Sequence, residues 1–186
     1  MDQLKPEWIL ALYAASAFAR SEAATAIYHL GRERAKNATR PWFQNPAFAA
    51  LCGPTPFVTV GLAVRQDTFA LIRAANDFPH LAEVPPEQDA TEFELRFAGG
   101  IALDILTTRD PEGHGAIAKF LAKQGEGIQQ VEFRCSDVNR ATAVLRDQFG
   151  QASIYPEKRP GANHTQVNFF LAPAANNSKV LVELYE

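Results

Sequence analysis

The chain has 186 residues, a hydrophobic share of 47% and a net charge of −3, which is enough to bury the core of one domain with an appendage. It has no basic stripe for nucleic acid, and no apolar run approaches the roughly 18 residues that cross a bilayer. Two cysteines, Cys52 and Cys135, are too few for a disulfide scaffold, and the first residues do not resemble a secretory signal, so a cytoplasmic location is expected.

Residues 1–56 are predicted to form a helical N-terminal extension. Apolar residues recur there at spacings of three and four, and Pro41 and Pro46 are expected to interrupt the helices. The apolar face is too large to leave in water, so it is expected to pack on the chain's own sheet or on a second copy, with a homodimer favoured. The residues that define this face are Trp8, Leu12, Tyr13, Ile27 and Leu30.

A first module is predicted over residues 57–108. An apolar strand opens it at Phe57, and a helix over 68–76 follows, with Asp67 as its expected cap. Phe93, Leu95 and Phe97 alternate with polar residues, which is typical of a half-buried strand. The pair Gly99–Gly100 indicates a hairpin turn into the closing strand 101–106.

The second module, residues 127–186, repeats this order. A strand ends at Cys135, and a helix over 138–148 follows, capped by Ser136 or Asp137 and ended by Gly150. Two further strands lie near 167–171 and 180–184. Two strand–helix–three-strand modules in tandem predict an α+β fold.

Four polar residues occupy equivalent places in the two modules. Thr59 and Gln130 lie on the opening strands, and Asp104 and Glu183 lie on the closing strands. If the modules are related by a pseudo-twofold axis, these side chains are expected to line one ligand pocket.

Several segments are similar to those of a known family, in the same order and at the same spacing. They are Ile117–Ile128, Val131–Phe133, Ser136–Val138, Arg159–Ala162 and Val180–Leu184, with Glu87-Gln88 as a further match. On these segments residues 57–186 resemble the vicinal oxygen chelate superfamily, which includes glyoxalases, dioxygenases and bleomycin-resistance proteins. Within it they most resemble the methylmalonyl-CoA epimerases. The resemblance implies paired βαβββ modules that form a cupped mixed sheet.

The resemblance also implies a divalent metal held by His, Glu or Gln, His and Glu. Carried over by position, these ligands fall on Thr59, Asp104, Gln130 and Glu183, so both histidine positions differ. Imidazole is the ligand that holds transition metals well in such a site, so no bound metal or other cofactor is expected.

The first functional hypothesis is an enzyme that abstracts a proton next to a carbonyl without a metal, an isomerase or lyase with an acyl-CoA as one candidate substrate. Glu87 matches the place of a family base, and His164 lies in a stretch that borders the pocket in relatives. A non-catalytic binding protein of the bleomycin-resistance type is the alternative, and a metal-dependent epimerase is a further one. Aromatic residues to line a binder's pocket would be Phe93, Phe97, Phe133, Phe169 and Phe170.

Overall fold

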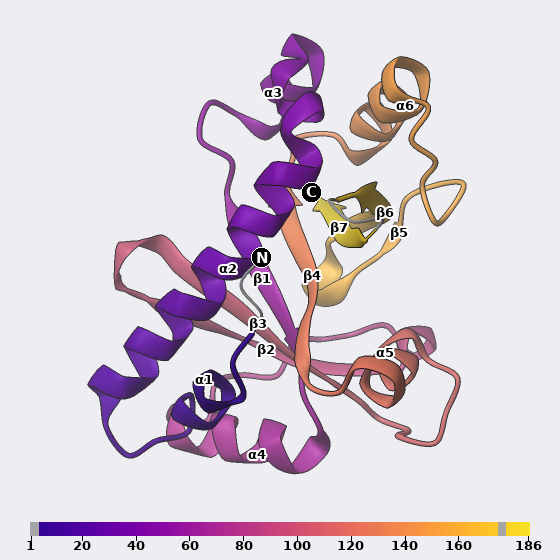
Figure 1. Ribbon diagram of the computed structural model, residues 1–186. Helices are drawn as coiled ribbons and strands as arrows, with labels where there is room; N and C mark the ends of the chain where they lie inside the picture. The colour runs from indigo at the N-terminus through magenta and orange to yellow at the C-terminus, as the bar shows by residue number, and fades with distance from the viewer. Residues whose placement is uncertain (1–3, 175–177) are drawn as a thin grey trace. The chain divides into compact units, whose positions relative to one another are not determined.

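A computed structural model describes residues 4–174 and 178–186 of the chain (Figure 1). Contacts within the chain divide it into two compact units. Unit 1 comprises Met1–Gly31 and Thr59–Gln129, and unit 2 comprises Arg32–Val58 and Gln130–Glu186. The N-terminal helical residues therefore contribute to both units, and each unit is described by itself.

Unit 1 is built on a three-stranded sheet in the order β2-β3-β1, in which β3 runs antiparallel to β2 and parallel to β1. Gly99 and Gly100, with φ of 77° and 76°, form the predicted turn between β2 and β3, in a conformation that glycine adopts without strain. The elements of unit 1, besides the first part of the long helix α2 (Ala17–Gln44), are α1 (Pro6–Ala11), β1 (Val58–Ala63), α4 (Gln66–Ala75), the 3-10 turn η1 (Pro86–Gln88), β2 (Ala90–Phe97), the 3-10 turn η2 (Ala98–Gly100), β3 (Ile101–Thr108) and α5 (Ala116–Gln124).

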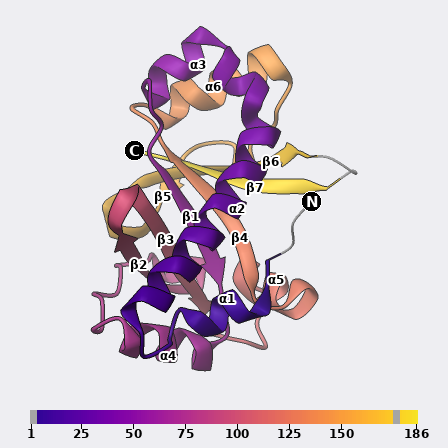
Figure 2. The same cartoon turned by 60° about the vertical axis from the view of Figure 1, so that its left-hand side comes forward.

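Helix α4 packs on one face of this sheet through buried Phe69, whose ring centroid lies 4.7 Å from that of Phe93. The predicted Asp67 cap is wrong. The helix begins at Gln66, so Asp67 already lies in the first turn, and its carboxylate accepts a hydrogen bond from the adjacent Thr68 N–H and does not cap the helix. Figure 2 shows α1 beside α4 within this unit, where the Asn76 side chain at the end of α4 donates to the Leu12 carbonyl at 2.9 Å.

The segment before β2 runs along that strand without becoming a regular strand itself. Ala82 N–H donates to the Glu92 carbonyl at 2.9 Å. Pro79, Pro85 and Pro86 have no N–H to donate, which explains why the pairing does not extend. Unit 1 therefore has the order β1-α4-β2-β3.

Unit 2 contains a four-stranded sheet in the order β4-β7-β6-β5, with β4 and β7 parallel and the other pairs antiparallel. The Asp137 carboxylate caps α6 by accepting from Arg140 N–H at 2.9 Å, and Gly150 ends the helix with a φ of 61°, both as predicted. Its elements, besides the last part of α2, are α3 (Pro46–Cys52), β4 (Gly127–Arg134, which begins in unit 1), α6 (Val138–Phe149), β5 (Arg159–Pro160), the 3-10 turn η3 (Ala162–His164), β6 (Gln166–Pro173) and β7 (Lys179–Tyr185). The predicted α+β fold is confirmed, although, among the residues that the structure describes, only two strands follow the helix of the first module where three were predicted. The module bounds, 57–108 and 127–186, stay a prediction.

Helix α2 continues through Pro41, contrary to the expected interruption. The proline removes one helical hydrogen bond, but aromatic contacts anchor the last turn. The Trp42 ring centroid lies 5.9 Å from that of Phe48 and 6.0 Å from that of Phe170, and Phe43 packs 5.2 Å from Phe48. Burial of these rings offsets the cost of the proline.

The predicted apolar face of the N-terminal helices is packed on the chain itself in part, and Trp8, Tyr13 and Leu30 are half-buried. Leu12 and Ile27 have no exposed surface. Gly31 of α2 lies so close to β1 that a Cβ placed on it would be 2.6 Å from a Val60 methyl group. Among the described residues, no helix has both the length and the apolar character needed to cross a bilayer.

Candidate functional site

A row of polar side chains lies on one face of the unit 1 sheet. Asp104 of β3 is in register with Gly61 of β1 and with Glu94 of β2. Residues in register point to the same face, and every second residue along a strand returns to it. Thr59 and Glu92 therefore share this face with Asp104, opposite the face that α4 covers. Of the predicted pocket residues, Thr59 and Asp104 are brought to one surface.

Glu92 is the most chemically distinctive of these residues, because burial raises the pKa of its carboxyl group to about 7. Its register partner Leu106 belongs to a buried apolar cluster that Phe120 and Leu121 of α5 also contact. The other cluster members are Ala63, Ala90 and Ile117. These neighbours disfavour the ionised carboxylate. A carboxyl group that exchanges its proton near pH 7 is suited to general acid–base catalysis.

Sequence reasoning missed Glu92, because the alternation around Phe93 assigned the intervening polar residues of β2 to a solvated face. The hairpin turn at Gly99–Gly100 was the available signal. Pairing the residues of the two strands outward from this turn places Glu94 opposite Asp104. Glu92 lies two residues further along β2 and therefore on the same face.

Glu87, the predicted base, lies on η1, just before β2 begins. It is exposed and is not part of the strand that carries Glu92 and Glu94. Its assignment as the base is an untested hypothesis that competes with Glu92, and the exchange experiment below separates the two.

The polar residues of unit 2 form a hydrogen-bonded group. The Gln130 amide nitrogen donates to a Glu183 carboxylate oxygen at 2.7 Å and to a Glu132 carboxylate oxygen at 3.1 Å. Glu132 and Glu183 are in register on β4 and β7, and Phe169 of β6 is in register with Glu183. The predicted pair Gln130 and Glu183 is therefore in direct contact. Whether it shares one pocket with Thr59 and Asp104 stays a prediction.

This contact fixes what the Gln130 amide can do. An amide nitrogen has two N–H groups, and here the two carboxylates accept from it. Gln130 is thus a link between Glu132 and Glu183 in unit 2, and its amide nitrogen is committed to them.

His164 lies in η3, in the loop that leads into β6. It is exposed, and both Asn163 and His164 have positive φ, at 50° and 64°. Its role beside a ligand stays a prediction.

Most of the aromatic residues expected to line a binding pocket are on the opposite faces of the sheets, and this expectation is wrong for Phe93 and Phe170. Phe93 and Phe170 have no exposed surface, and Phe133 is 5% exposed. Phe93 packs on α4, Phe170 on Trp42 and Phe133 on Phe43, because these strands use their apolar alternate residues for the cores. Phe97 shares the Phe93 face by alternation, whereas Phe169 lies on the polar face of unit 2.

The residues at the four predicted ligand positions do not fit a transition-metal site. They offer one hydroxyl, one amide and two carboxylates, and the amide nitrogen of Gln130 is directed at Glu183. Among residues 4–174 and 178–186, no group of three or more His, Cys, Asp and Glu is placed to hold a metal ion. A hydroxyl and an amide are weak ligands for zinc, cobalt or nickel.

Comparison with known proteins gives matches among solved structures. A methylmalonyl-CoA epimerase from Mycobacterium tuberculosis has a TM-score of 0.56 and 32% sequence identity, and the match covers 69% of this chain and 85% of that one. A variant of the Streptomyces coelicolor methylmalonyl-CoA epimerase in complex with 2-nitronate-propionyl-CoA has a TM-score of 0.55 and 26% identity, over 70% and 96% of the two chains. A methylmalonyl-CoA epimerase in complex with methylmalonyl-CoA and NH4+ has a TM-score of 0.55 and 27% identity, over 70% and 93%.

A scan of protein-family models found no match, and a search of curated proteins found none. The similarity to the M. tuberculosis enzyme extends over most of that enzyme's length and agrees with the order of elements in the two modules. The chain therefore belongs to the methylmalonyl-CoA epimerase family of the vicinal oxygen chelate superfamily.

Proposed function

We propose that the chain is an enzyme that moves a proton at the carbon next to the thioester carbonyl of an acyl-CoA, without a transition metal. An isomerase or epimerase is the reaction class that fits best, with a lyase as a variant of the same first step. Two of the similar structures contain acyl-CoA compounds by name. The observation that carries the proposal is Glu92, a carboxyl group with a pKa of about 7 on the polar face of unit 1.

In the proposed step, the Glu92 carboxylate takes the proton from the carbon between the thioester carbonyl and the rest of the acyl group. The electron pair of the broken C–H bond moves into the carbonyl group and gives an enolate. Transfer of a proton from a water molecule to the opposite face of that carbon inverts it, and Glu92 then releases its own proton to solvent. In deuterated buffer the incoming deuteron labels the carbon. A pKa near 7 keeps part of Glu92 ionised at neutral pH while leaving it more basic than an ordinary carboxylate.

The enolate oxygen needs a hydrogen-bond donor, since stabilising this charge is a large part of catalysis in such reactions. The Thr59 hydroxyl group is buried on the face that Glu92 shares, but it lies in the row of Ala102, four residues along the strands from the row of Leu106 and Glu92. It is therefore too distant to contact the enolate that Glu92 forms. The Gln130 amide nitrogen is a weak candidate too, because its N–H groups are given to Glu132 and Glu183.

The alternative of a non-catalytic binder depended on an aromatic pocket wall. Phe93 and Phe170 are core residues with no exposed surface, so two of the five aromatic residues proposed for this wall are not available to a ligand. The homodimer stays a prediction, which sedimentation velocity of the purified protein tests.

The test is solvent exchange into methylmalonyl-CoA and propionyl-CoA in deuterated buffer, followed by NMR, with protein dialysed against EDTA. We expect exchange into at least one compound and a loss of roughly a hundredfold or more in Glu92→Gln, the size typical of removing a general base. Glu87→Gln is the matched control and should keep its rate within about threefold, because exposed substitutions rarely disturb a fold.

Three outcomes contradict the proposal. Exchange that disappears with EDTA and returns with cobalt would show a metal enzyme. Loss of exchange in Glu87→Gln but not in Glu92→Gln would make Glu87 the base. Tight binding of both compounds without exchange would show a binding protein.

A further inference from the structure

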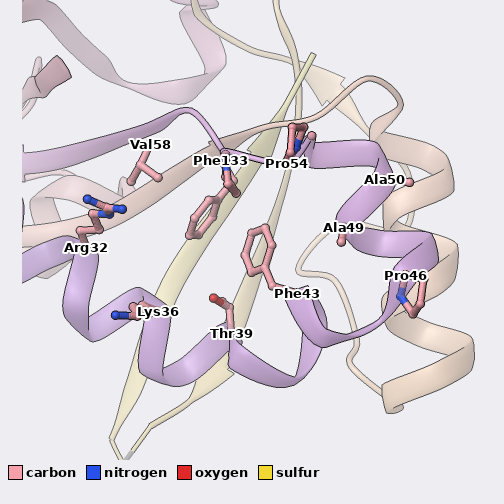
Figure 3. A pocket seen from close by; sticks show the side chains of 12 residues that line it. Arg32, Lys36, Thr39, Phe43, Pro46, Ala49, Ala50, Pro54, Val58 and Phe133 are labelled. Atoms are coloured by element: carbon pink, nitrogen blue, oxygen red, sulfur yellow. The ribbon is translucent and has the colours of Figure 1, made fainter.

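A pocket lies in unit 2, where the N-terminal helices meet the sheet. It has a volume of about 610 Å³ and is enclosed by the last part of α2, by α3 and its following loop, and by β4 (Figure 3). Its lining residues used below are Arg32, Lys36, Thr39, Phe43, Ala49 and Phe133. This volume is in the range of small-molecule sites, about 300–1,000 Å³.

This pocket is separate from the polar group of unit 2. Phe133 lines it, whereas Glu132 accepts from Gln130. Consecutive residues of a strand point to opposite faces of the sheet, so the pocket and the Gln130 group lie on opposite sides of β4. A ligand in this pocket would therefore not contact the Gln130 group.

The body of the pocket is apolar. Phe43 and Phe133 pack together at 5.1 Å between ring centroids, and Ala49 projects from α3 toward them in Figure 3. The Thr39 hydroxyl is committed to the Ala35 carbonyl at 2.8 Å. A bound molecule would find no ready polar partner in this part, so it should be hydrocarbon there.

One rim of the pocket is basic. Arg32 and Lys36 lie one helical turn apart on α2 and are both exposed. Lys36 pairs with Glu33 at 3.3 Å, but the two side chains are 62% and 57% exposed, so this pair is weak and exchangeable. None of the lining residues that the structure describes is acidic. The rim therefore favours an anion.

We propose that this pocket binds a fatty acid, with the hydrocarbon chain on Phe43 and Phe133 and the carboxylate at Arg32 and Lys36. The combination of an apolar body, no free polar partner inside and two cations at one rim matches a ligand with a single anionic end. Neither a neutral nor a cationic amphiphile matches the rim. The helices of residues 1–56 thus supply a ligand site in addition to their packing role.

The test is calorimetric titration of the full chain with octanoate, decanoate and dodecanoate below their micelle concentrations. Each added methylene group should tighten binding roughly fourfold, since a buried CH₂ is worth about 0.8 kcal/mol. Decyltrimethylammonium, which has the same chain and the opposite charge, should bind at least tenfold more weakly than decanoate.

Two variants locate the site. The double substitution Arg32→Gln and Lys36→Gln should weaken decanoate binding at least fivefold, whereas Arg40→Gln, on the same helix but outside the pocket, should not change it. Ala49→Phe should fill the pocket and abolish binding while circular dichroism stays unchanged. If Ala49→Phe does not fold, the comparison of the Arg32→Gln and Lys36→Gln double variant with Arg40→Gln still tests the location of the site.

The proposal is overturned if no fatty acid binds, if decyltrimethylammonium binds as tightly as decanoate, or if the Arg32 and Lys36 substitutions leave the affinity unchanged. It is also overturned if sedimentation shows a dimer of the unmodified chain that Ala49→Phe dissociates, because a second copy would then occupy the pocket. None of these results depends on the exchange activity.

Discussion

Replacing Glu92 with Gln should stabilise the protein in a strongly pH-dependent way. Burial raises the pKa of this carboxyl group from an ordinary value of 4.5 to about 7. Since each pKa unit is worth about 1.4 kcal/mol, keeping Glu92 ionised in the folded chain costs about 3 kcal/mol. Gln is close in shape to the protonated carboxyl group and carries no charge to desolvate, so it should avoid this cost.

The sign follows from proton binding. Between pH 4.5 and about 7 the folded state holds the Glu92 proton and the unfolded state does not. The contribution of Glu92 to stability is therefore fully present below pH 4.5 and is lost as the pH rises through about 7. The gap between the variant and the unmodified protein should be small at pH 4.5 and reach about 3 kcal/mol at pH 8.

Urea unfolding at several pH values between 4.5 and 8 measures this gap. Glu94→Gln is the control, because Glu94 is exposed on the same strand and face and is ion-paired with Arg96. Its substitution should change stability by about 0.5 kcal/mol or less at every pH. A Glu92→Gln gap that stays constant across this range would refute the reasoning, because Glu92 would then titrate like an ordinary carboxyl group.

Three further changes test the packing of the chain. Gly31→Ala should lower the melting temperature, because the new Cβ would lie 2.6 Å from a Val60 methyl group, and this clash should outweigh the helix preference of Ala. A higher melting temperature would show that β1 shifts away at little cost. Thr107→Val should raise the free energy of unfolding by about 1 kcal/mol, because the buried hydroxyl oxygen has no hydrogen-bond partner among the described residues. A lower urea midpoint would show that the hydroxyl group does form a hydrogen bond in the folded protein. Burial raises the pKa of Cys52 to about 12 and of Cys135 to about 11, so both thiols should react with a disulfide reagent at pH 8 only after urea is added; rapid native reaction would contradict this burial.

Local signals in the sequence predicted the second module well. Asp137 and Gly150 mark both ends of α6 because capping depends on side chains and backbone conformations within a few residues. The turn at Gly99–Gly100 was predictable for the same reason, because its positive φ angles depend on the two glycines themselves. The Asp67 cap failed because the helix start is displaced by a residue or two, which the pattern alone does not specify.

Other features depend on contacts between distant residues, and sequence patterns missed them. Pro41 lies inside α2 because Trp42 contacts Phe170, far along the chain. Phe133 packs on Phe43 of the N-terminal extension and lines a pocket there, which the sequence did not indicate. The raised pKa of Glu92 needs α5 and β3 to bring apolar side chains to β2, so composition could not reveal it.

Of the candidate site, the equivalence of the two modules predicted that four polar residues line one pocket. The structure brings Gln130 into contact with Glu183 and puts Thr59 and Asp104 on one face, and the shared pocket stays a prediction. Glu92, the proposed base, did not follow from the sequence, because module equivalence says nothing about which carboxyl group on a face is desolvated.

The pH dependence of deuterium exchange tests the central claim most directly. For metal-free protein and an acyl-CoA that exchanges, the rate constant kcat/KM should rise from pH 5.5, pass an inflection near the pKa of Glu92, about 7, and level off above it. Glu92→Gln should remove both the rise and the rate. A profile that is flat between pH 5.5 and 8.5, or an undiminished rate in Glu92→Gln, would contradict the assignment of Glu92 as the base.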